Sequence, residues 1–176
     1  MRSSRTIFLL IAALTALAGC GYNNNSNSNS SGYQWKSVYR QDIRTVAVPI
    51  FKSTVYERGV EFSLSKALVQ QIEANTPYKV VPRERADTIL EGEIVTVDIH
   101  TLSNDRFSAI PQEQLLDITV DFTWKDLRTG KILVSRRGVE QTATFYPTLG
   151  EGRATGTQAA SERLALSIVQ ELQADW

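Results

Sequence analysis

The stretch LDITVDFTWK, residues 116–125, decides the class of fold. Its apolar residues are Leu116, Ile118, Val120, Phe122 and Trp124, and they alternate with Asp117, Thr119, Asp121, Thr123 and Lys125. Successive side chains of a β-strand point to opposite faces of the sheet. The stretch therefore predicts a strand with one buried face and one face in water, which is typical of an antiparallel sheet.

The residues after this strand predict a hairpin and then a helix. Asp126 to Gly130 has the composition of a tight turn with Gly130 at a positive φ, and it leads into a strand over residues 131–145. Thr155-Gly156-Thr157-Gln158 matches a capping box, which predicts that the closing helix begins there. The apolar side expected for that helix consists of Leu164, Ala165, Ile168 and Leu172.

The residues before residue 82 predict a β-α-β unit. Residues 44–51 alternate in polarity, and Pro49 limits pairing near the end of the segment, as in an outer or terminating strand. Residues 60–75 predict a helix with an apolar stripe of Leu64, Ala67, Leu68 and Ile72. Thr76-Pro77 ends the helix, and residues 78–81 form a short strand that is reached by the usual right-handed crossover.

The apolar pattern changes phase within residues 88–100. Leu90 and Ile94 share one phase, whereas Val95, Val97 and Ile99 take the other. Such a switch predicts a β-bulge or a strand that leaves its sheet. The full order is then β-α-β-β-β-β-α. We expect an α/β fold of the α+β sandwich type, a mixed sheet with two α-helices packed on one face.

The N-terminus predicts an exported lipoprotein. In residues 1–19, Arg2 and Arg5 precede an uncharged segment whose apolar part is too short to span a bilayer, so these residues are expected to form a signal peptide. Leu17-Ala18-Gly19-Cys20 has the form of a lipobox, and Cys20 is the only cysteine. We therefore expect Cys20 to be acylated; the alternative is an ordinary secretory signal with a chance cysteine.

Two further segments complete the predicted organisation. Residues 20–32 combine the lipidated cysteine with a tether rich in Asn and Ser, which lacks the apolar surface needed to order it. Gly21 follows the cysteine where an aspartate would, in many enteric bacteria, retain the protein in the inner membrane, so outer-membrane sorting is expected. Residues 33–176 are long enough for a single domain.

Composition excludes several classes of function. Removing Arg2 and Arg5 from the 19 basic residues leaves 17 against 19 acidic ones, a formal charge of about −2, which argues against nucleic-acid binding. With one histidine, no spare cysteine and no phosphate-binding lysine motif, neither an enzyme nor a cofactor or metal site is expected. His100 is interpreted as a surface residue, and residues 150–156 as a flexible connector.

Four motifs together resemble the LPS-assembly lipoprotein family, LptE. They are Cys20-Gly21-Tyr22, Thr45-Val46-Ala47-Val48-Pro49-Ile50-Phe51, Gly59-Val60-Glu61-Phe62 and Ala86-Asp87-Thr88-Ile89-Leu90-Glu91-Gly92. The resemblance extends from Cys20 through the final helix. It implies an outer-membrane lipoprotein, anchored on the periplasmic face, that sits inside a large β-barrel partner of the LptD type, helps it to fold and assists delivery of lipopolysaccharide to the cell surface.

The resemblance also implies two lipopolysaccharide-binding residues. By position, Arg106 matches a basic residue in the loop between the middle strands, and Arg153 matches one before the last helix. A guanidinium pairs well with lipid A phosphates. The alternative is that both are solvated surface arginines.

A second functional class stays open at this point. Val46-Ala47-Val48-Pro49-Ile50-Phe51 and the helix after it also resemble outer-membrane lipoproteins that activate a peptidoglycan synthase or form part of a secretion pore. The partner that co-purifies with the protein would separate these alternatives.

Overall fold

The structure is a computed structural model that describes residues 37–173. The expected signal peptide, Cys20 and the tether lie outside the described residues. Within residues 37–173, no helix combines the length and the apolar character that a membrane-spanning helix needs.

One mixed sheet forms the body of the domain. Three long antiparallel strands, β4 (Thr88–Asn104), β5 (Pro111–Asp126) and β6 (Ile132–Phe145), lie side by side. The short strand β1 (Thr45–Ala47) pairs in parallel with both β4 and β3 (Lys79–Val80), which gives the order β3-β1-β4-β5-β6. A further short strand, β2 (Lys52–Ser53), pairs in parallel with β4.

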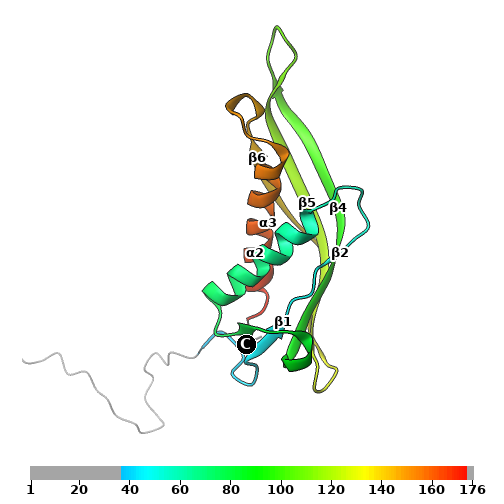
Figure 1. The fold of residues 1–176 in the computed structure, drawn as a ribbon, viewed down its shortest axis with the longest axis vertical. Helices are drawn as coiled ribbons and strands as arrows, with labels where there is room; N and C mark the ends of the chain where they lie inside the picture. Colours follow the sequence, from blue (N-terminus) through cyan, green and yellow to red (C-terminus); the bar gives the residue numbers. More distant parts are fainter. Residues whose placement is uncertain (1–36, 174–176) are drawn as a thin grey trace, which may run out of the picture. The chain divides into compact units, whose positions relative to one another are not determined.

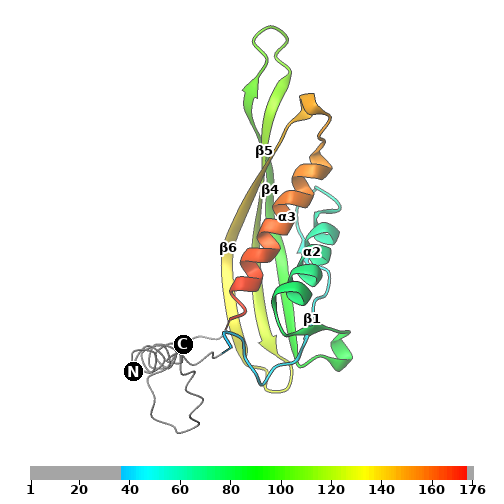
Figure 2. The same cartoon turned by 90° about the vertical axis from the view of Figure 1, so that its left-hand side faces the viewer.

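Two helices cover one face of this sheet. Both α2 (Val60–Asn75) and α3 (Arg153–Gln170) lie on the same side of the strands (Figure 2). Short 3₁₀ turns, Arg83–Arg85 and Pro147–Leu149, precede β4 and α3. The expected fold class is confirmed, and the predicted elements occur in the expected order; only β1 lies within the first predicted strand, and β2 is an additional short strand just after it (Figure 1).

The alternation in β5 produces the core as expected. All five apolar side chains of the stretch are buried, and Trp124 and Ile118 are completely shielded from solvent. The buried residues of α3 include Ala160, Leu164, Ala165, Ile168 and Val169. Leu172 is also buried, just beyond the end of the helix. Full burial of one large apolar side chain stabilises a fold by about 1.5–3 kcal/mol, so this single strand contributes substantially to the core.

The phase change in β4 is a β-bulge. Ile94 pairs with Val120, but Thr96 pairs with the very next residue of β5 towards its start, Thr119, so Val95 is an extra residue in the ladder. Its side chain is 42% exposed. The bulge lets Leu90 and Ile94 on one side of it, and Val97 and Ile99 on the other, all pack against the core.

The position of β1 corrects one expectation. Residues 44–51 were expected to form an outer or terminating strand, but β1 lies between β3 and β4. The strand does terminate before Pro49, which has no amide hydrogen for a sheet ladder. The alternation then fails, because Ile50 is 56% exposed and the buried residue is Phe51. The ring of Phe51 lies against Gly92, where a Cβ atom would come within 2.3 Å of it.

The capping box is the second expectation that the structure contradicts. Helix α3 begins at Arg153, its N-cap is Gly152, and no side chain caps it. Gln158 donates to Glu162 instead of reaching back to the cap. The reason is packing: Gly156 lies against the ring of Phe145, so the first turn of the helix is already seated on β6. The expected flexible connector over residues 150–156 is therefore partly helical.

Candidate functional site

The turn between β4 and β5 projects beyond the rest of the sheet. Gln114 of β5 pairs with Phe145, the last residue of β6, so the earlier residues of β5 pair with β4 alone. The hairpin tip, defined here as residues 105–110, lies at the far end of this two-stranded extension (Figure 1). Arg106 is exposed within it.

Asp105 fixes the conformation of the hairpin tip. Its Oδ1 atom accepts hydrogen bonds from the amides of Phe107 (2.9 Å) and Ser108 (2.8 Å), and from Ser108 Oγ (2.9 Å). The amide side chain of Gln112 donates to Oδ2. Donation from Ser108 and Phe107 to the ionised carboxylate lowers the pKa of Asp105. Arg106 is therefore held on an ordered turn.

Arg153 has a different setting. It is the first residue of α3, and its Nη1 atom lies 2.8 Å from Glu57 Oε2, in the segment that precedes α2. Arg153 bonds to Glu57, and no hydrogen bond or ion pair joins it to Arg106 among the described residues. The two residues singled out from the sequence do not form one compact site.

The face of the sheet without helices carries the polar residues of β5. This polar face consists of Asp117, Thr119, Asp121, Thr123 and Lys125 with their neighbours on β4 and β6. Glu93 stands directly opposite Asp121, and Asp98 opposite Asp117. Like charges across a strand pair are unfavourable unless other groups offset them. The amide of Gly138 partly does so by donating to Asp121 Oδ1 at 2.7 Å.

His100 has a partner that sequence reasoning missed. Its Nε2 atom lies 3.1 Å from Asp117 Oδ2 across β4 and β5. The sequence gives no sign of this partner, because the pairing register of two strands is not visible in the spacing of residues within one strand. The imidazole side chain is 63% exposed. In residues 37–173, no group of three His, Cys, Asp or Glu side chains is arranged to hold a metal ion.

A shallow pocket of about 420 Å³ lies on the polar face. Its charged lining contains three basic residues, Lys52, Arg136 and Arg137, and three acidic ones, Glu91, Glu93 and Asp121. Arg136 is paired with Glu171 and Glu91 with Arg83. The lining therefore has no net formal charge, and it suits broad polar contact better than the capture of one ion.

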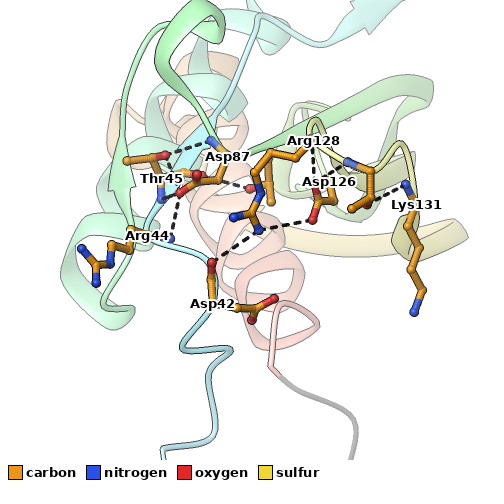
Figure 3. Close-up of polar contacts among 9 residues, drawn as sticks. Asp42, Arg44, Thr45, Asp87, Asp126, Arg128 and Lys131 are labelled. Carbon is orange, nitrogen blue, oxygen red and sulfur yellow. Dashed lines mark hydrogen bonds and ion pairs between the residues drawn. The ribbon is translucent and has the colours of Figure 1, made fainter.

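A polar cluster joins three segments of the chain (Figure 3). It lies at the end of the β4–β5 ladder where Thr88 pairs with Asp126, opposite the hairpin tip. Asp87 accepts hydrogen bonds from Thr45 Oγ1 (2.9 Å) and from the amides of Arg44 and Thr45 (both 3.1 Å), and these donors lower its pKa. Arg128 Nη2 reaches the backbone oxygen of Asp42 at 3.5 Å. This cluster ties β1 to the start of β4 and is structural in character.

A model of a known protein family matches most of the chain. The model of the family LptE, described as lipopolysaccharide-assembly, matches residues 43–175. A search of curated proteins finds no match.

Solved structures share the fold at low sequence identity. Uncharacterized lipoprotein B from Nitrosomonas europaea has a TM-score of 0.53 and 16% identity, covering 81% of this chain and 90% of its own. The PelC dodecamer from Paraburkholderia phytofirmans has a TM-score of 0.51 and 15% identity, covering 79% and 96%. A hypothetical protein from Chlamydia trachomatis has a TM-score of 0.50 and 11% identity, covering 73% and 94%. At these identities the likeness concerns the fold alone.

Proposed function

The chain belongs to the LptE lipopolysaccharide-assembly family, and from that premise we propose that it is the lipoprotein partner of an LptD-like β-barrel in the outer membrane. In this role it is anchored through acylated Cys20 on the periplasmic face, helps the barrel to assemble and assists the delivery of lipopolysaccharide to the cell surface. It acts by binding, not as an enzyme. The family match over residues 43–175 carries the proposal.

The polar face of the sheet supports a position inside a barrel. The lumen of a large outer-membrane barrel is hydrophilic, so a protein that fills it needs a polar outer surface. Asp117, Asp121 and Lys125 supply such a surface, while both helices occupy the other side of the sheet.

Co-purification tests the barrel partnership. An affinity-tagged form of the full chain, extracted from membranes with a mild detergent, is expected to bring down one large outer-membrane β-barrel. A peptidoglycan synthase in its place would favour the alternative of a synthase activator. A ring of identical subunits would favour a secretion pore. Either result would overturn the proposed partnership.

We further propose that Arg106 and Arg153 bind the phosphates of lipopolysaccharide. Arg106 lies on an ordered, exposed turn, and a guanidinium can bind a phosphate through two parallel hydrogen bonds. Arg153 is paired with Glu57, and a phosphate would have to compete with that carboxylate. Arg106 is therefore expected to contribute more to binding than Arg153.

Charge reversal at the two positions tests this site. Arg106→Asp with Arg153→Asp should weaken binding of purified lipopolysaccharide at one stated ionic strength, with the fold and the barrel association unchanged, because exposed substitutions seldom alter stability much. The single variants assign the effect to each residue. Equal affinities of double variant and wild type would make both arginines ordinary surface residues.

A further inference from the structure

The hairpin tip presents large apolar side chains to solvent. Phe107 is 99% exposed, Ile110 at the end of the tip is 53% exposed, and Leu102 in the adjoining part of β4 is 52% exposed. A fully exposed phenylalanine on a turn that four hydrogen bonds to one carboxylate hold in place is an ordered apolar projection. Nothing in residues 37–173 covers it (Figure 1).

The backbone of the tip is already largely hydrogen-bonded within the tip itself. The amide of Asp105 donates to Ile110 O (2.9 Å), and that of Ala109 donates to Asp105 O (3.1 Å). The amides of Phe107 and Ser108 donate to the Asp105 carboxylate. An unpaired amide is costly to bury in an apolar medium, so internal pairing lowers the cost of moving this turn out of water.

The charges of the tip suit the boundary between a phosphate layer and hydrocarbon. The Asp105 carboxylate accepts hydrogen bonds from its own turn. Arg106 forms no ion pair or side-chain hydrogen bond with any described residue. Arg106 directly precedes Phe107, and its long side chain can hold a guanidinium at a polar layer while the neighbouring ring enters an apolar one.

We infer that the hairpin tip places Phe107, flanked by Leu102 and Ile110, among the acyl chains of lipopolysaccharide while Arg106 meets a phosphate of the same molecule. The inference rests on the proposed function and adds an apolar contact to a site defined so far by charge alone. A protein pocket is a poorer match, because most amides that a partner's backbone would pair with are already taken within the turn.

Binding of purified lipopolysaccharide to Phe107→Ser tests the inference. The experiment uses the full acylated chain in one detergent, at low and at high salt. The Phe107 ring would be buried only in bound lipopolysaccharide, so its loss should weaken binding at least about tenfold at both salt concentrations. The loss caused by Arg106→Asp should shrink at high salt, because screening weakens charge pairs and leaves apolar contacts intact. Phe107→Leu should restore most of the affinity.

Ile132→Ser is the matched control. Ile132 is 56% exposed on the β5–β6 hairpin, at the opposite end of the long strands, and its replacement should leave lipopolysaccharide binding unchanged. Unchanged thermal unfolding of each variant verifies that the fold is intact.

Each other outcome has a defined meaning. If Phe107→Ser binds as wild type does while Arg106→Asp binds more weakly, the inference fails and the proposed function stands. If wild type binds no lipopolysaccharide, the proposed lipid site fails as well. Equal Phe107-dependent binding to phosphatidylglycerol vesicles would overturn the choice of lipopolysaccharide in favour of the bilayer. If Phe107→Ser co-purifies with less barrel but binds lipopolysaccharide as wild type does, the inference is overturned and Phe107 docks in a protein pocket.

Discussion

Asp87 is the residue at which the start of β4 meets the start of β1. Its carboxylate accepts hydrogen bonds from the side chain of Thr45 and from the amides of Arg44 and Thr45, and the amide of Asp87 itself donates to Thr45 Oγ1. The hydrogen bonds that Thr45 and the Arg44 amide donate to the carboxylate favour its ionised form, so the pKa of Asp87 lies below its ordinary value of 3.8.

A dependence of stability on pH follows from this residue. A carboxyl group with a lowered pKa in the folded state adds stability above its ordinary pKa and loses it as pH falls through the folded value. Asp87→Asn should therefore be less stable than wild type at neutral pH, and the difference should shrink below about pH 4. Chemical denaturation of both proteins across this range measures it. A difference that stays constant with pH would contradict the prediction.

Gly156 gives a prediction in which two effects oppose each other. Replacing a glycine inside a helix by alanine usually stabilises it by about 1 kcal/mol. At this position, however, the new Cβ atom would lie 2.6 Å from Cδ1 of the buried ring of Phe145. Overpacking of a core costs about 1–3 kcal/mol, so we expect the clash to outweigh the gain in helix propensity.

Thermal unfolding of Gly156→Ala measures the net effect, and the expected result is a lower Tm. Phe145→Leu in the same chain should reduce the additional cost of the alanine, because the two positions are in contact and their effects are coupled. A Gly156→Ala variant that is more stable than wild type would show that the ring moves aside freely.

At the scale of the elements, the bulge in β4 decides which side chains the strand buries. The bulge absorbs one residue, Val95, so that Leu90 and Ile94 face the core together with Val97 and Ile99. The switch of apolar phase in the sequence predicted either a bulge or a strand that leaves its sheet, because no regular strand can bury both sets, and the structure shows the bulge.

Deletion of Val95 should therefore remove the bulge and leave the fold intact. Without the extra residue, Ile94 and Thr96 become neighbours that still oppose Val120 and Thr119, so the strand is regular and both apolar sets remain on the core face. Deletion of Asp98, in the regular part of the ladder, is the contrasting variant: it turns Ile99 away from the core or shifts the pairing with β5, and should lower the stability strongly. Circular dichroism and thermal unfolding distinguish the two variants. A Val95 deletion that unfolds the protein would contradict the prediction.

For the whole molecule, attachment to the membrane through Cys20 stays a prediction, because the residue lies outside the described range. Cys20→Ala should abolish acylation, since the chain has no other thiol. Labelling of cells with radioactive palmitate, followed by isolation of the protein, measures this. The wild-type protein should carry label and the variant none. Undiminished label in Cys20→Ala would show that the modified group is elsewhere.

The sequence alone determined the main elements, the class of fold and the presence of an irregularity in β4. Each depends on the period of apolar residues along one segment, and burial of a strand face or a helix stripe requires that period wherever the segment lies. The family followed from short motifs such as Ala86-Asp87-Thr88, and comparison confirmed it.

Only the tertiary structure decided which residues stand beside one another. The placement of β1 between β3 and β4 and the pairing of His100 with Asp117 depend on strand register, which the spacing of residues within one strand does not encode. The early start of α3 depends on Gly156 meeting Phe145, eleven residues earlier in the chain. The separate settings of Arg106, on a projecting turn, and Arg153, paired with Glu57, have the same physical origin: contacts between distant segments form only when the chain is folded.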